Sequence, residues 1–222
     1  RIKASRPELS ILNPSFTRQT LLDTSTHQPV IASLPDTQAR RIPGNRGIWV
    51  GIFCVLVEFT VLFSVYFIAK AHHPDAFRAG PDRLLTTAGV AITLLLLASG
   101  YCMVKAIEVI RVNRHRAAAL WVLAAIVLGL GYPAVKFFEI NYYIADGIVG
   151  RAGIFYGTYY YLTLNHLVHV GWGLMGLIFV AMRSAMGKYN AGNYSGLEAA
   201  AMYWHTTDIL WLVIFQLFYV LR

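Results

Sequence analysis

The stretch E-A-A-A-M-Y-W-H-T-T-D-I-L-W at residues 198–211 places an imidazole, His205, and a carboxylate, Asp208, inside the last of five long apolar segments. Ionisable side chains are costly in the interior of a lipid bilayer, so their presence there requires a structural or functional reason. These two residues are therefore the first site hypothesis. The segments around them indicate the class of protein.

The composition is that of an integral membrane protein. Hydrophobic residues make up 57% of the 222 residues and charged residues 14%, which is too apolar for a soluble domain with one buried core. A hydrocarbon layer of about 30 Å takes around 20 helical residues to cross. Five segments have this length, and we place them near 47–69, 84–107, 117–139, 153–182 and 197–221.

These segments are expected to be helices, because a backbone in lipid must pair its polar groups within its own segment. The predicted fold is all-α, a polytopic bundle of five transmembrane helices over residues 47–222, joined by short polar loops. Residues 1–46 are basic and rich in proline, which prevents a long helix, and we expect them to form a cytoplasmic arm. Lys and Arg are more abundant on the side of this arm, which favours a cytoplasmic N-terminus and an outside C-terminus.

Three more ionisable residues lie near the middle of their segments: Glu58 in the first, and His166 and His169 in the fourth. The spacing of three residues puts His166 with His169, and His205 with Asp208, on one face of a helix each. Groups at similar depth on neighbouring helices can pair, which lowers the cost of burying each one. We therefore expect one shared buried polar cluster between the first, fourth and fifth helices.

Three interpretations of this cluster stay open. It can be interhelical structure without chemistry, or it can bind a lipid head group or modulate proton movement near a partner. The third is axial ligation of a b-type haem by His166, His169 or His205. Two further functions of the whole protein also stay open. It can be an ion carrier that uses the same histidines, or an assembly factor without a site of this kind. No phosphate-binding glycine loop, nucleophile elbow or zinc signature occurs, which disfavours a self-contained hydrolase or nucleotide enzyme.

The outer end of the third segment is interpreted as an interface with the membrane surface. Lys136 and Glu139 are three residues apart there, and snorkelling toward the membrane surface explains them as well as a function does. Tyrosines gather near the same end and are expected to form an interfacial aromatic belt: Tyr142, Tyr143, Tyr156, Tyr159 and Tyr160.

Five ordered stretches resemble one family, cytochrome c oxidase subunit III. The last segment resembles the family pattern E-x(4)-Y-W-H-x-x-D-x-x-W through Glu198, Tyr203, Trp204, His205, Asp208 and Trp211. Y-L-T-L-N-H-L-V-H-V at 161–170 is similar to T-G-x-H-G-x-H-V, and A-D-G-I-V-G at 145–150, with Asp146 and Gly147, to the S-D-G-x-x-G loop. F-F-E-I at 137–140, with Glu139, and G-I-F-C-V-L-V-E-F at 51–59 resemble the remaining two motifs.

The resemblance implies a short, five-helix member of that family, acting as an accessory, non-catalytic subunit of a haem–copper respiratory oxidase in a bacterial cytoplasmic membrane. It implies that this chain holds no metal, that haem and copper or iron lie in a catalytic subunit I, and that phospholipid is bound. No nucleic-acid partner is implied. Departures from the pattern at Val57, Leu164, Asn165, Leu167 and Val168 bring the chain closer to the subunit-III-like proteins that accompany nitric oxide reductase, which is the alternative.

Overall fold

The computed structural model describes residues 43–221, which form helices and no β-strand. Four helical stretches in this range are long and apolar enough to cross a membrane. They are α1 (Arg46–His72), α3 (Thr86–Arg111), the stretch His115–Ala145 made of α4 (His115–Gly129) and α5 (Gly131–Ala145), and α6 (Ile154–Ala185). The first four predicted segments are confirmed as helices of that kind, each longer than expected.

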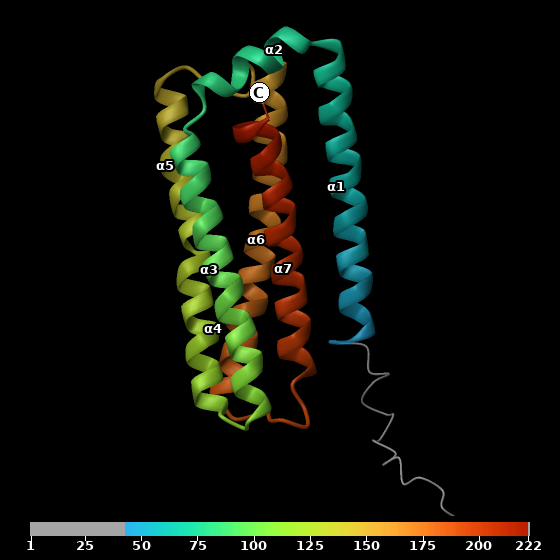
Figure 1. Ribbon diagram of the computed structural model, residues 1–222, viewed down its shortest axis with the longest axis vertical. Helices are drawn as coiled ribbons and strands as arrows, with labels where there is room; N and C mark the ends of the chain where they lie inside the picture. The colour runs from blue at the N-terminus through green and yellow to red at the C-terminus, as the bar shows by residue number, and fades with distance from the viewer. Residues whose placement is uncertain (1–42, 222) are drawn as a thin grey trace, which may run out of the picture. The chain divides into compact units, whose positions relative to one another are not determined.

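The fifth predicted segment corresponds to α7 (Ser195–Phe215), which continues into a π-helical turn, η2 (Gln216–Val220). It is helical as predicted, but it is not among the four candidate spans. Its middle carries His205, Thr206, Thr207 and Asp208 in succession. The C-terminus lies at the same end of the bundle as the short helix α2 (Pro74–Ala79), which precedes the 3-10 turn η1 (Gly80–Arg83) (Figure 1).

The break between α4 and α5 has a local cause. Pro133 has no backbone N–H, so the carbonyl of Gly129 loses its usual partner four residues further on. Leu130, between the two helices, keeps right-handed helical backbone angles, and the chain therefore continues in helical form through residues 115–145.

The start of α1 is set by a cap. The side chain of Asn45 accepts a hydrogen bond of 2.9 Å from the backbone N–H of Ile48, which satisfies one of the free donors in the first turn. Just before it, the backbone N–H of Gly44 donates to Oε2 of Glu198 at 3.2 Å, which ties this end of the chain to α7. The expected basic arm is placed at 1–46, and its residues 1–42 lie outside the described part of the chain.

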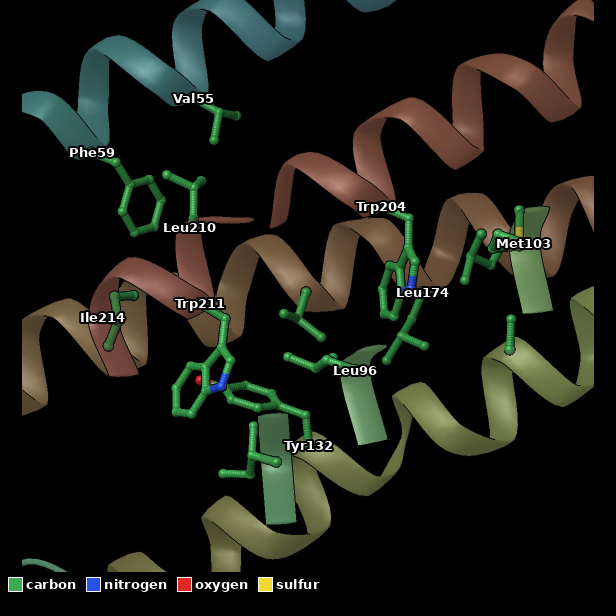
Figure 2. Close-up of a cluster of buried hydrophobic side chains, with 14 of the residues drawn as sticks. Val55, Phe59, Leu96, Met103, Tyr132, Leu174, Trp204, Leu210, Trp211 and Ile214 are labelled. Atoms are coloured by element: carbon green, nitrogen blue, oxygen red, sulfur yellow. The ribbon is translucent and has the colours of Figure 1, made fainter. Parts of the chain in front are cut away.

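Two tryptophans of α7 organise the core, as Figure 2 shows. The indole N–H of Trp204 donates to Oγ of Ser99 on α3 at 3.0 Å. Its ring occupies space left by glycine: a Cβ on Gly129 or Gly173 would come within 2.7 or 2.8 Å of it. Small residues thus allow α4 and α6 to approach the ring closely.

The second tryptophan, Trp211, lies two turns further along α7. Its indole N–H donates to Oγ1 of Thr93 on α3 at 3.0 Å. Its ring packs edge-on against Tyr132 of α5, with 5.1 Å between the ring centroids (Figure 2). Two large side chains on one face therefore fasten helix α7 to four neighbours, α3, α4, α5 and α6.

Helix α1 joins the bundle through aromatic side chains. Phe59 is fully buried and lies edge-on to His169 of α6, at 5.4 Å between centroids. Near the other end, the hydroxyl of Tyr66 donates to the carbonyl of Leu217 in η2 at 2.9 Å. The π-helical turn therefore presents a carbonyl that holds α1 in place.

Candidate functional site

Glu58 of α1 contacts two side chains of α6, and we call Glu58, Asn165 and His169 the Glu58 group. Oε2 of Glu58 lies 3.3 Å from Nε2 of His169, and Oε1 accepts a hydrogen bond of 2.9 Å from Nδ2 of Asn165. The hydroxyl of Tyr203 lies 3.3 Å from Nδ1 of the same imidazole. A neutral ring with its hydrogen on Nε2 satisfies both neighbours, since Nδ1 then accepts from the phenol.

The Glu58 group opens to the outer surface of the bundle. The side chain of Glu58 is 44% exposed, and a hollow of about 560 Å³ lies over it, lined also by Tyr161, Leu164 and Val168. A carboxylate in the middle of a candidate span and facing outward is costly in lipid. Its two oxygens are paired with Asn165 and His169, which lowers that cost.

His166 lies apart from that surface, fully buried in the core. Its Nε2 is 3.0 Å from the carbonyl oxygen of Thr207, which can only accept, so Nε2 carries the hydrogen. Rings of Tyr132, Trp211 and Phe59 surround it at centroid distances of 5.2, 5.6 and 6.2 Å. The hydrogen bond joins α6 to α7 inside the core.

His205 and Asp208 lie on yet another side, against α3. Nδ1 of His205 is 3.8 Å from Oδ2 of Asp208, as expected from their spacing on one helix face. Gly100 of α3 faces them closely: a Cβ there would lie 2.8 Å from Oδ2 of Asp208 and 3.3 Å from the imidazole. We call these two side chains the His205–Asp208 pair.

The five residues expected to form one buried cluster thus occupy three places, which corrects that expectation. The reason is the direction in which each side chain leaves the axis of α7. Successive residues of a helix turn by about 100°, so Tyr203 and His205, two positions apart, point in nearly opposite directions. Because Tyr203 contacts His169 on α6, His205 faces α3 instead. Similar depth in the membrane does not imply a common face.

Lys136 and Glu139 belong to a closed polar ring that the sequence does not predict. Nζ of Lys136 lies 2.6 Å from Oε2 of Glu139, with both side chains fully buried. Lys136 also donates to the hydroxyl of Tyr159 at 3.1 Å, which lies 2.9 Å from the hydroxyl of Tyr219. Tyr219 donates to Oε1 of Glu139 at 2.8 Å, closing the ring. We call these four residues the Lys136 ring.

Further side chains around the Lys136 ring complete the burial of Lys136 and Glu139. Tyr143 donates to Oε1 of Glu139 at 2.8 Å and accepts from the backbone N–H of Leu85 at 2.8 Å. Nζ of Lys136 also lies 5.2 Å from the ring centroid of Trp211, within the range of a cation–π contact. Buried charges are tolerated when they are paired and hydrogen-bonded in this way.

The snorkelling expected for Lys136 and Glu139 is therefore wrong, and Tyr143 and Tyr159 do not face lipid as members of an aromatic belt would, because both are fully buried. One local pattern could have indicated this polar group: the spacing of Lys136, Glu139 and Tyr143 places all three on one face of a helix. The partners Tyr159 and Tyr219 come from distant segments, and no local pattern indicates them.

The other residues singled out by motif have structural positions. Asp146 caps the C-terminal end of α5. Gly147 follows with φ of +72°, a conformation that residues with a side chain rarely adopt. Glu198 accepts from Gly44 at the start of α1, as described above. Within residues 43–221, no three His, Cys, Asp or Glu side chains gather in a way that could hold a metal ion.

A substitution at Gly100 tests the close approach of α3 to the His205–Asp208 pair. Gly100→Ala is expected to lower the free energy of unfolding in detergent by about 1–3 kcal/mol, the usual cost of overpacking, because the new Cβ meets Oδ2 of Asp208. Gly171→Ala on α6 is the matched control, since a Cβ there meets nothing within 4 Å. Equal stability of the two variants in thermal unfolding would contradict this packing.

Comparison with known proteins gives the family. Residues 84–221 match the family described as cytochrome c oxidase subunit III. This chain belongs to that family. The match begins just after η1 and covers all of α3 to η2, so it includes His166, the Lys136 ring and the His205–Asp208 pair, while Glu58 on α1 precedes it.

Curated relatives of this subunit III family agree with the match. A cytochrome c oxidase subunit 3 of Synechocystis is 31% identical over 165 residues, covering 73% of this chain and 69% of the relative. One from Bacillus sp. PS3 is 29% identical over 178 residues, covering 79% and 84%. A probable quinol oxidase subunit 3 of Staphylococcus saprophyticus is 23% identical over 175 residues, covering 79% and 87%.

Proposed function

We propose that this chain is an accessory, non-catalytic subunit III of a haem–copper respiratory oxidase, of the short five-helix form. The observation that carries the proposal is the family match over α3 to η2, together with relatives named as subunits of cytochrome c and quinol oxidases. Haem and copper then belong to a catalytic subunit I, against which this chain packs, and that partner reduces oxygen.

The proposed topology has five crossings, with α7 as the fifth, residues 47–222 as the membrane domain and 1–46 as an arm on the cytoplasmic side. A contact between two of the connecting loops supports this topology. Asn113 follows α3 and Ala191 precedes α7. The side-chain Oδ1 of Asn113 accepts a hydrogen bond of 2.8 Å from the backbone N–H of Ala191. Helix α7 therefore starts at the end where α3 ends. Arginines gather at that end, which favours the cytoplasmic face of a bacterial inner membrane: Arg111, Arg114, Arg116 and Arg183.

Two supporting roles follow from the outer surfaces. The Glu58 group pairs an outward carboxylate with an imidazole, a combination suited to passing or storing a proton near the catalytic partner. Phospholipid is proposed to lie in an apolar hollow of about 340 Å³ between α1, α6 and α7, where Gly176 leaves open space for an acyl chain. This hollow is lined by Ile48, Trp172, Gly173, Gly176, Ala200 and Tyr203.

Purification of the tagged chain from its native membrane in mild detergent tests the proposal. We expect a co-purifying polypeptide with haem absorption, oxygen consumption by the preparation, phospholipid in its extract, and slower turnover in a Glu58→Gln variant with an unchanged haem spectrum. Mass spectrometry identifies the haem-bearing chain. Consumption of nitric oxide in place of oxygen would instead support the reductase alternative, and a haem band in this chain alone would overturn the accessory role.

A further inference from the structure

Two loops, the one after α3 and the one before α7, form a single basic surface. They are joined by the hydrogen bond of 2.8 Å from the backbone N–H of Ala191 to Oδ1 of Asn113. The stretches 109–119 and 181–197 contain no Asp or Glu, so their positive charge is not balanced locally. We call the Lys and Arg residues of these stretches the basic loop surface: Arg111, Arg114, Arg116, Arg183 and Lys188.

The side chains of the basic loop surface differ in what holds them. The guanidinium of Arg111 lies 5.7 Å from the ring centroid of Tyr194. That of Arg183 lies 5.4 Å from the ring centroid of Tyr189, and both distances are within the range of cation–π contacts. The other side chains are exposed and make no hydrogen bond, ion pair or ring contact with another residue of the range 43–221: Arg114, Arg116 and Lys188. Their charge is therefore available to an anion from outside.

A hollow opens beside the two unpaired arginines, Arg114 and Arg116. Its volume is about 400 Å³, and residues 113–117 line it. A guanidinium presents its N–H donors in a planar fork that matches the oxygens of a phosphate, and it keeps its charge at physiological pH. The hollow is therefore suited to a phosphate group.

The basic loop surface lies at the level of lipid head groups. Helix α3 has 26 residues, a length of about 39 Å. A hydrocarbon layer is about 30 Å thick, and the bilayer with its head groups about 40–45 Å, so the loop after α3 lies outside the hydrocarbon. Apolar side chains beside the arginines are also exposed, namely Val112 in this loop and Leu120, one turn further into α4 than Arg116. A ligand here meets cations and apolar surface together.

We propose that the basic loop surface binds the phosphate of an anionic phospholipid, of the phosphatidylglycerol or cardiolipin class, at Arg114 and Arg116. The acyl chains then lie along Val112 and Leu120. A lipid with choline or ethanolamine carries a cation beside its phosphate, which the unpaired cations of this surface repel, so the surface selects a head group of net negative charge. The site is separate from the acyl-chain hollow at Gly176, and the inference rests on the membrane topology of the proposed function.

Titration with phosphatidylglycerol, followed by native mass spectrometry, tests this site in the full chain. The tagged chain is purified from its native membrane in mild detergent with the polypeptides that accompany it, and the bound lipids are counted. Arg114→Gln combined with Arg116→Gln is expected to raise the apparent Kd of one phosphatidylglycerol site about 30-fold, because each Arg near an anionic lipid contributes about 1 kcal/mol. The control removes the same charge at the other end of the bundle, by Arg83→Gln combined with Arg151→Gln, and is expected to leave that Kd unchanged.

Each of four results would overturn the inference. An equal rise of Kd in both double variants would mean a general attraction between charges. An equal Kd for phosphatidylcholine would mean that the charge of the head group is not recognised. Binding of inorganic phosphate that excludes phosphatidylglycerol would assign the site to free phosphate. Loss of an accompanying polypeptide from the Arg114 and Arg116 variant, with lipid binding unchanged, would assign the surface to a protein.

Photo-crosslinking provides a second test that keeps the arginines intact. Benzoylphenylalanine at Val112, in bilayers with equal amounts of phosphatidylglycerol and phosphatidylcholine, is expected to give about ten-fold more adducts with phosphatidylglycerol. The same probe at Val149, in the loop between α5 and α6, is expected to show no preference. Equal adducts of the two lipids from Val112 would contradict the site.

The two proposals fail in different ways. If no haem polypeptide accompanies the tagged chain, the proposed function is wrong, while lipid binding at Arg114 and Arg116 is still measured on the chain itself. If a haem polypeptide co-purifies and phosphatidylglycerol shows no preference for this surface, only the inference drawn here is wrong.

Discussion

Replacing Glu139 by alanine is expected to lower the free energy of unfolding in detergent by about 3–5 kcal/mol, because it leaves Lys136 charged and unpaired in the core. Both side chains are fully buried, so water cannot replace the missing carboxylate. The same change removes the acceptor of Tyr219 and Tyr143. Thermal unfolding of the purified variant, followed by helical circular dichroism, measures the effect.

The chain contains a matched control for this pair. Lys105 and Glu108 have the same spacing of three residues and a similar distance of 2.7 Å, but their side chains are 33% and 53% exposed. Glu108→Ala is expected to change stability by less than about 1 kcal/mol, as for other exposed ion pairs. Replacing Lys136 and Glu139 together, by Met and Leu, should recover much of the loss, since no lone charge remains. If Glu139→Ala is as mild as Glu108→Ala, the Lys136 ring does not stabilise the fold.

Trp204→Ala is expected to have an effect of similar size, about 3–5 kcal/mol, because it opens a cavity at the contact of α7 with α3, α4 and α6. The substitution also leaves the hydroxyl of Ser99 without the indole N–H that now donates to it. The glycines that accommodate the ring, Gly129 and Gly173, cannot fill the space themselves. Thermal unfolding of the variant in detergent gives the magnitude.

Trp172→Ala is the control for that experiment. Trp172 lies on α6, one residue from Gly173, but its ring faces outward and is exposed. Its removal opens no cavity in the core, so we expect a change within about 0.5 kcal/mol, as for other surface substitutions. If Trp172→Ala lowers the free energy of unfolding as much as Trp204→Ala, the loss does not depend on the core packing shown in Figure 2.

The helices were predictable because the pattern that encodes them is local. Runs of about 20 apolar residues must be helical in lipid, and the expected segments at 47–69, 84–107, 117–139 and 153–182 each agree with a helical candidate span, to within two residues at the start. The start of α1 follows from the Asn45 cap, and the break between α4 and α5 follows from the N–H that Pro133 lacks. The crossing of α7 stays a prediction, since polar residues in its middle set it apart from the other four.

The site residues were recognised individually, but their grouping was not. Glu58, His169 and the His205–Asp208 pair stood out because ionisable groups are rare at such depth. Their spacing of three residues correctly predicted that His205 lies near Asp208. Which neighbour each pair faces depends on the rotation of α7 about its axis. That rotation is set by Trp204 and Trp211, which lock onto Ser99 and Thr93 of α3.

The sequence by itself determined the class of protein, the helical segments, the family and the residues that carry charge inside the membrane, because each of these depends on residue type and local spacing. Only the tertiary structure decided that Lys136 and Glu139 are buried in a ring with Tyr159 and Tyr219, and that Asp208 faces Gly100 of α3, apart from Glu58 and His169. The physical reason is that burial and hydrogen-bond partners arise from the packing of helices far apart in the chain, and packing is fixed by the side chains of all of them together.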